Sequence, residues 1–176
     1  PWVNRVLNRV EPAQPRIEID LVQGAHLVLQ EGPSRGIYYT EARSDRRGIF
    51  LMPWQGHCLL GTTETVFTGD PERTEPTPDE IGYLLENVKH HFPGLDTRVV
   101  DQWSGLRVLL RGQGDLFRRP REMVLLPGHG NPPRLVTLYG GKLTGYRASA
   151  LKALKRLRPA LPPATPRGDT AELPLQ

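Results

Sequence analysis

Lys142 and the two glycines before it are the residues of this sequence best placed to bind an electron-rich ligand. Gly140 and Gly141 lie between a β-branched apolar run and a helical pattern, so the chain is predicted to turn tightly there and enter a helix. The first amides of a helix have no partner within it and point out of its positive end, which suits an anion or a polarised carbonyl. Lys142 adds a full positive charge. A tight turn alone would explain the glycines equally well, so both interpretations remain.

Arg107 is the second candidate, because it lies within an apolar strand-like run just after Gly105. A half-buried arginine is costly unless it is paired. It therefore either pairs with an internal carboxylate such as Asp101 or Glu64, or faces a cavity that receives an anionic ligand. Its planar guanidinium suits a phosphate or a carboxylate, which can accept two parallel hydrogen bonds.

The remaining polar residues carry weaker signals. His26 is placed at the edge of a strand, where a structural role is the commoner one and a base or donor is the alternative. Turn and capping roles explain Glu64 and Asp70 better than hydrolysis by paired carboxylates. No histidine–carboxylate spacing indicates a metal site, and the sequence lacks a P-loop and a dinucleotide-binding glycine motif.

The elements that position these residues are predicted to form an α+β fold. The 18 glycines and 18 prolines in 176 residues argue against a helical bundle and favour strands joined by turns. We expect a mixed, mostly antiparallel sheet with packed helices, and a turn at Gln23 and Gly24 between its first two strands. The predicted strands cover residues 16–22, 25–29, 37–40, 48–54, 57–63, 99–110, 122–126 and 135–139.

One helix has clear start and stop signals. Thr77 is predicted to be its N-cap, with Pro78 in the first turn and Glu80 completing a capping box, and Pro93 and Gly94 end it. Its apolar stripe is predicted to pack on the sheet. A second helix follows Gly141 and runs to residue 157, a short helical pattern precedes residue 11, and residues 111–120 read as a polar loop.

Charge and composition exclude several functions. The net charge is +4 and the isoelectric point is near 9.5, but the basic residues are scattered and not interleaved with aromatics, so we expect no nucleic-acid binding. The single Cys58 lies in an apolar run and is predicted to be buried and inert, which fits a reducing, cytoplasmic location. No apolar run approaches membrane-spanning length. The chain starts without Met and is expected to be a piece of a longer protein.

Taken in order, several short motifs resemble the bacterial FAD-dependent glycerol-3-phosphate dehydrogenases and glycerophosphate oxidases, which are D-amino-acid-oxidase-like flavoproteins. The resemblance covers essentially residues 1–157. The matching motifs are residues 1–4, 24–28, 50–54, 61–63, 69–71, 104–107, 140–144 and 146–147. The sequence departs from the family, which usually has aspartate at Glu64, proline at Val108 and threonine at Gly145.

The resemblance implies a division of the chain. Residues 1–133 would be the substrate-binding domain, residues 134–157 a strand–Gly–Gly–helix segment of the FAD-binding domain, and residues 158–176 a proline-rich tail. Because the dinucleotide fingerprint is missing, the isolated chain is expected to be colourless and inactive.

The resemblance also implies roles for individual residues. Arg107 would grip the phosphate of glycerol 3-phosphate, and the family's additional substrate arginine would be Arg121 or Arg119. Lys142 would lie near the flavin and the reacting carbons, and His26 is a candidate base. The segment of Gly140, Gly141, Lys142, Leu143 and Thr144 would approach the electron-rich edge of the flavin.

The complete enzyme would oxidise glycerol 3-phosphate to dihydroxyacetone phosphate and pass the electrons to a quinone, or to oxygen as in the oxidases. It would act as a peripheral protein on the inner face of the cell membrane, as a homodimer. Two alternatives are a related flavin amine or amino-acid oxidase, in which the same arginine would hold a carboxylate, and a non-catalytic binding module.

Overall fold

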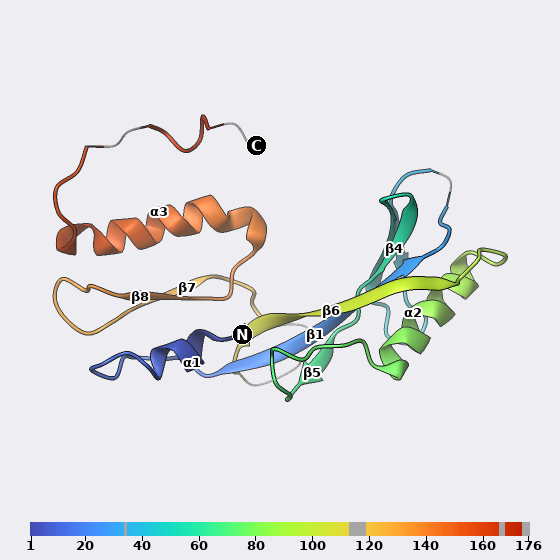
Figure 1. Cartoon of the computed structure of the whole chain (residues 1–176), viewed down its shortest axis with the longest axis horizontal. Helices are drawn as coiled ribbons and strands as arrows, with labels where there is room; N and C mark the ends of the chain where they lie inside the picture. The colour runs from blue at the N-terminus through green and yellow to red at the C-terminus, as the bar shows by residue number, and fades with distance from the viewer. Residues whose placement is uncertain (34, 113–118, 166–167, 174–176) are drawn as a thin grey trace.

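The computed structural model describes residues 1–33, 35–112, 119–165 and 168–173. Figure 1 shows two groups of elements that the long strands β1 (Ile19–Leu29) and β6 (Val99–Leu110) connect. One group is a sheet with helix α2 (Pro78–His91) on one face. The other contains α1 (Val3–Leu7), a hairpin and α3 (Tyr146–Leu157).

β1 is the central strand of the larger sheet. Along one edge it pairs with β6 over its full length. Along the other edge it pairs with β4 (His57–Gly61) at its C-terminal end and with β5 (Thr65–Phe67) nearer its start. Beyond β4 the sheet continues through β3 (Gly48–Trp54) to β2 (Tyr38–Glu41). Every pairing among the described strands is antiparallel, which confirms the predicted α+β fold with a mainly antiparallel sheet.

The predicted turn at Gln23 and Gly24 is wrong. Both residues lie in the middle of β1, and Gly24 is directly opposite Gly105 of β6 in a ladder whose register shifts only between Val28 and Leu29. His26 consequently lies within a strand that is paired on both sides, and not at a strand edge. The glycine at this position serves a close contact across the face of the sheet and not a change of chain direction, as the site shows below.

The core lies between the sheet and α2. Thr77 accepts a hydrogen bond from the Glu80 amide at 3.2 Å, and Glu80 in turn accepts from the Thr77 amide at 3.0 Å, so the predicted capping box is confirmed. Leu84 and Val88 are fully buried, as their stripe predicts. The buried cluster comprises Ala25, Leu27, Leu29, Ala42, Ile49, Leu51, Cys58, Leu60, Leu84 and Val88.

The second group is built on a hairpin of β7 (Val124–Pro127) and β8 (Val136–Tyr139), with α3 alongside. Tyr139 fastens it to the N-terminal segment: its hydroxyl donates to Asn4 Oδ1 at 2.9 Å and accepts from the Ile17 amide at 3.2 Å. A 3₁₀ turn (Leu143–Gly145) separates Lys142 from α3, so the predicted second helix begins later than expected. The predicted loop at 111–120 falls largely on residues 113–118, outside the described part of the chain.

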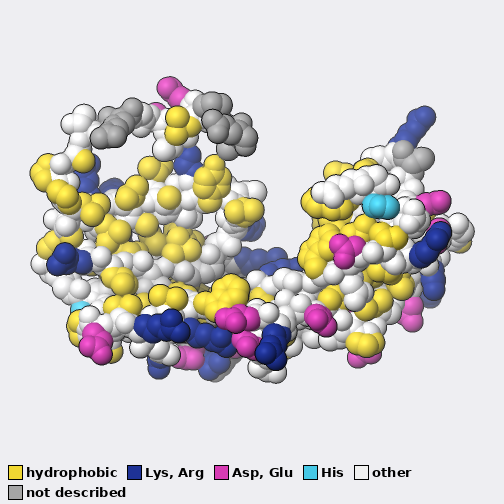
Figure 2. Space-filling view, in the orientation of Figure 1, with side chains coloured by type: hydrophobic (Ala, Val, Ile, Leu, Met, Phe, Trp, Pro, Cys, Tyr) yellow, Lys and Arg dark blue, Asp and Glu magenta, His cyan; other side chains and the backbone are white. Residues whose placement is uncertain are grey.

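α3 leaves its apolar side chains exposed. None of its residues is buried, and Tyr146, Leu151 and Leu154 are all exposed. Figure 2 shows hydrophobic side chains over α3 and the hairpin in the same part of the molecule. After the 3₁₀ turn Arg158–Ala160, the described residues of the tail contain neither helix nor strand. Within the described ranges no helix combines the length and the apolar character needed to cross a membrane.

Candidate functional site

The face of the larger sheet opposite α2 presents the candidate polar residues. Ala25 and Leu27 pack toward α2, so Gly24 and His26, which alternate with them, point to the other face. In an antiparallel ladder, residues directly opposite point to the same side. Trp103 lies opposite His26, and their rings are stacked with centroids 5.9 Å apart.

Arg107 reaches along this face and lies across Gly24. Its Nη1 donates to Glu64 Oε1, and its Nη2 donates to Thr62 Oγ1 at 3.3 Å. A Cβ atom at Gly24 would lie 2.9 Å from Nη2 and 2.6 Å from Thr62 Oγ1, so only glycine fits beneath the guanidinium. Burial lowers the pKa of Arg107, and the charge of Glu64 opposes this effect.

The Glu64 carboxylate lies within 4 Å of three arginine side chains. Its Oε1 also accepts from Arg121 Nη2 at 2.6 Å, and its Oε2 lies 3.9 Å from Arg47 Nη1. The Glu64 side chain is only 14% exposed. Of the two partners considered for Arg107, Glu64 and not Asp101 is the one that pairs with it. The turn or capping role favoured for Glu64 is therefore wrong, whereas Asp70 does accept from a turn amide, that of Glu72, at 3.4 Å.

A buried network anchors the loop that carries Glu64 and Thr62. Glu80, 4% exposed, accepts from Thr63 Oγ1 at 2.7 Å and from Thr65 Oγ1 at 2.9 Å. Thr63 Oγ1 also accepts from the Ala25 amide at 2.8 Å, which ties the loop to β1. Burial raises the pKa of Glu80, but its hydrogen bonds, led by that from the Thr77 amide, outweigh this and lower the pKa overall. Glu80, in the first turn of α2, thus holds the loop that carries Thr62 and Glu64, the two hydrogen-bond partners of Arg107.

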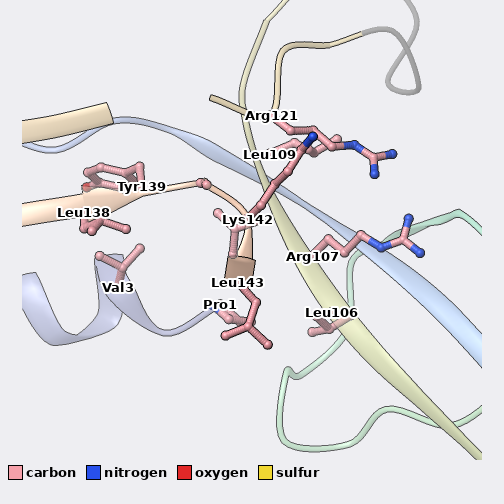
Figure 3. Close-up of a pocket in the computed structure, with 13 residues that line it drawn as sticks. Pro1, Val3, Leu106, Arg107, Leu109, Arg121, Leu138, Tyr139, Lys142 and Leu143 are labelled. Carbon is pink, nitrogen blue, oxygen red and sulfur yellow. The ribbon is translucent and has the colours of Figure 1, made fainter. Parts of the chain in front are cut away.

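A cavity of about 660 Å³ lies between β6 and the segment that follows β8 (Figure 3). Three cationic side chains, those of Arg107, Arg121 and Lys142, line it. Figure 3 shows the guanidinium groups of Arg107 and Arg121 extending in the same direction from their backbones. Apolar side chains such as Leu109 and Leu138 complete the wall. The cavity therefore combines positive charge with a low-polarity lining, which suits an anionic organic ligand.

The structure separates the two candidates for the additional arginine. Arg119 Nη1 donates to Asp20 Oδ2, outside the cavity, and Asp20 also accepts from Arg111 at 3.2 Å. Arg121 lines the cavity and shares Glu64 with Arg107. Of these two arginines, Arg121 is the one in contact with the other candidate residues.

The segment after β8 has the backbone that only glycine adopts easily. Gly140 and Gly141 have φ values of 66° and 89°. A Cβ at Gly140 would also lie 2.9 Å from the Glu122 carbonyl oxygen. The first helical hydrogen bond runs from the Gly145 amide to the Lys142 carbonyl at 2.9 Å, so the intervening amides precede the hydrogen-bonded turn. This exposed run of amides beside Lys142 fits the electron-rich edge of a flavin ring.

His26 is held beside the arginine cluster but does not line the cavity. A Cβ at its neighbour Gly61 would lie 2.4 Å from the ring, so glycine is required there too. Burial lowers the pKa of His26, and the charge of Arg107 lowers it further. Its Nδ1 is buried and has no hydrogen-bond partner among the described residues. Burial and the neighbouring charge both favour the neutral imidazole over the protonated one.

Three further residues at the site were not predicted from the sequence. His26 contacts Trp103 and Gly61, and Arg107 contacts Thr62. The pairing of distant strands brings these residues together. The glycines in the middle of predicted strands were the available clue, since such glycines often mark a close approach.

Metal and thiol chemistry have no support in the described residues. These residues contain no group of three or more His, Cys, Asp or Glu side chains that could hold a metal ion. Cys58 is buried, as predicted, and burial raises the pKa of its thiol, which makes it less reactive.

Comparisons with known proteins agree on one family. The profile of the family described as FAD dependent oxidoreductase matches residues 1–147. The glycerol-3-phosphate dehydrogenase of Pseudomonas tolaasii is 33% identical over 168 residues, which are 90% of this chain and 32% of that protein. The D-erythritol 1-phosphate dehydrogenase of Brucella abortus is 31% identical over 167 residues, covering 92% of this chain and 33% of that protein.

A solved structure is also similar. The glycerol-3-phosphate dehydrogenase from Bacillus halodurans, complexed with FAD, superposes with a TM-score of 0.71 and 28% sequence identity. The match covers 91% of this chain and 30% of that one. The chain thus spans about a third of the length of the relatives that it matches.

Proposed function

This chain belongs to the family of FAD-dependent oxidoreductases, and we propose that it forms the substrate-binding part of an enzyme that oxidises sn-glycerol 3-phosphate to dihydroxyacetone phosphate. Residues 1–133 would bind the substrate and residues 134–157 would belong to the FAD-binding domain. The names of the relatives support this substrate. The observation that carries it is the cavity lined by Arg107, Arg121 and Lys142.

Three cations around one cavity suit a phosphate monoester better than a carboxylate. A phosphate monoester carries a charge of about −1.5 to −2 at neutral pH and offers three strong acceptor oxygens. Arg107 and Arg121 present planar donor groups to one region, and Lys142 adds a point charge from the opposite wall. Glu64 offsets one of these charges, so the cluster stays ordered before the ligand binds.

Gly140 to Thr144 would hold the electron-rich edge of FAD. When bound, FAD supplies the acceptor for the hydride that leaves the secondary alcohol. The amides before the first helical hydrogen bond and the ammonium group of Lys142 provide positive charge at that edge. Lys142 also lines the cavity, so it would contact both the substrate and the edge of the cofactor.

His26 would accept the proton of the hydroxyl group. Oxidation of a secondary alcohol to a ketone releases one hydride and one proton, so a base must take the proton. Because Nδ1 is buried, the proton would be accepted by Nε2 of the neutral imidazole, and the His26 side chain is only partly buried. Burial and the charge of Arg107 beside it both favour the neutral ring.

The same proposal includes a quinone as the final electron acceptor, a peripheral position on the inner face of the cell membrane, and a homodimer. These three parts follow from the sequence motifs shared with bacterial glycerol-3-phosphate dehydrogenases.

A substrate panel on the complete, flavin-loaded protein tests the reaction. We expect sn-glycerol 3-phosphate to reduce the flavin anaerobically, seen as loss of its visible absorbance, and D-amino acids and amines to leave it oxidised. Reduction by an amino acid and not by glycerol 3-phosphate would favour the oxidase alternative and overturn the proposal.

A further inference from the structure

We infer that the bare strand surface over Gly105 binds the carbon chain of the phosphorylated polyol, so that Gly105 is a specificity-determining residue; the inference rests on the function proposed above. The surface is called the Gly105 subsite here. It lies on the sheet face that carries Arg107 and His26, and it is defined by three successive cross-strand pairs of β1 and β6.

The register places the two glycines between the two functional rows. Val22 pairs with Arg107, then Gly24 with Gly105, then His26 with Trp103. Rows on one face of a sheet are about 7 Å apart. The middle row has no side chain of its own on either strand, so only groups from neighbouring residues can cover it.

The two halves of this middle row differ. Over Gly24 the space is filled, since a Cβ there would meet Thr62 Oγ1 at 2.6 Å and Arg107 Nη2 at 2.9 Å. Over Gly105 no described atom lies within 4 Å of the position a Cβ would occupy. Gly105 is also exposed, and the next two residues, Leu106 and Arg107, line the cavity.

The fold itself gives no reason for glycine at this position. Gly105 does not have the positive φ that favours glycine, and it lies inside a paired strand, where glycine weakens the sheet. A glycine in a strand interior often marks a bulge, a bend, or a site where a ligand or another backbone approaches closely, and the regular pairing on both sides of Gly105 leaves the last of these. Here the open side belongs to the proposed active site.

The two sides of the subsite match the two ends of a short polyol phosphate. On one side the Arg107 guanidinium, lying over Gly24, offers charge to the phosphate. On the other side His26, stacked on Trp103, offers a neutral base to a hydroxyl group. A carbon chain that joins phosphate and hydroxyl would lie over Gly105. A methyl group at this position would occupy that space without coming within 4 Å of another described atom.

The test compares Gly105→Ala and Gly105→Val with the control Gly82→Ala in the complete, flavin-loaded protein. Gly82 lies in α2, and a Cβ there also meets no described atom within 4 Å, so we expect the fold to tolerate both alanines. We expect all three variants to unfold at or above the temperature of the wild type. KM for sn-glycerol 3-phosphate should rise at least about tenfold in Gly105→Ala, and activity should be lost in Gly105→Val. Gly82→Ala should match the wild type.

Inorganic phosphate separates this inference from the function on which it rests. As a competitive inhibitor it reaches the cations without a carbon chain, so its inhibition constant should stay within about twofold in Gly105→Ala. An unchanged KM in that variant would overturn the role of Gly105 while leaving the proposed function intact. An equal loss of phosphate binding would also overturn it, because the methyl group would then act by moving Arg107. If the wild type shows neither flavin reduction nor phosphate competition, the proposed function fails first.

Discussion

Arg107 and Glu64 form an ion pair at the centre of the candidate site, and the same Glu64 oxygen also accepts from Arg121 at 2.6 Å. The guanidinium that is proposed to bind the substrate is thus already engaged by an internal carboxylate. An incoming phosphate must share or replace the donors that Glu64 uses. The pair keeps the arginines ordered and also opposes the binding of an anion.

Glu64→Gln should make the protein depend on added anion for stability. The substitution keeps the size of the side chain but leaves Arg107 and Arg121 without their carboxylate. Removing one partner of a partly buried pair is destabilising, and partial exposure of Arg107 reduces the loss to about 1–2 kcal/mol. Thermal unfolding with and without inorganic phosphate measures the effect. Phosphate should raise the melting temperature more in Glu64→Gln than in the wild type; an equal rise would show that Glu64 and phosphate do not share donors.

Glu80→Gln should weaken substrate binding from outside the site. Glu80 fixes the loop that presents Thr62 and Glu64 to Arg107, and an amide cannot accept all the hydrogen bonds that the carboxylate accepts. We expect KM for glycerol 3-phosphate to rise several-fold with little change in kcat, since the proposed base and cofactor segment are untouched. Leu84→Val, in the same helix, is the control for lost stability alone. An equal rise in KM in both variants would show that Glu80 acts only through the stability of the fold.

His26 should titrate below its ordinary value of about 6.5. Burial and the charge of Arg107 both lower its pKa, because both disfavour the protonated ring. The folded state therefore binds this proton less tightly than the unfolded state does. The stabilising contribution is complete above about pH 6.5 and is lost as the pH falls toward the folded pKa. In the free energy of unfolding against pH, the wild type should decline more steeply below pH 6.5 than His26→Gln; parallel curves would contradict the lowered pKa.

Gly140→Ala should reduce flavin retention. Gly140 has a φ of 66° and closely approaches the Glu122 carbonyl, so a methyl group costs about 1–2 kcal/mol and displaces the segment proposed to hold the flavin edge. Gly145→Ala is the matched control, because the φ of Gly145 is −94° and a Cβ there meets no described atom within 4 Å. The ratio of flavin to protein absorbance after purification is the measurement. Equal flavin content in the two variants would argue against this role for the segment.

The local signals in the sequence predicted the parts of the fold that depend on neighbouring residues. The capping box of Thr77 and Glu80 and the glycine turn before Lys142 are each encoded within a few positions, and both were confirmed. Strand β5 was missed because it has three residues and owes its existence to pairing with β1. The residues of a short strand do not show which distant strand will pair with it.

Gly24 shows why the site itself was harder to predict. A glycine between two apolar runs is a common turn signal, yet here it makes room for a guanidinium from a residue 83 positions later, Arg107. The same limit applies to Glu64, whose three arginine neighbours come from different parts of the chain. Residue types identified Arg107 and Lys142 as candidates. Only the ladder between β1 and β6 shows which groups surround Arg107.

Anaerobic titration of the complete, flavin-loaded protein with sn-glycerol 3-phosphate tests the central claim most directly, by comparing wild type, Arg107→Ala and the control Arg98→Ala. Arg98 is exposed and pairs only with Asp96 among the described side chains. Loss of a charged partner for the phosphate should cost about 2–5 kcal/mol, so the half-maximal rate of anaerobic flavin reduction in Arg107→Ala should require at least about thirtyfold more substrate. Arg98→Ala should follow the wild-type curve. Coincident curves for Arg107→Ala and wild type would contradict the account.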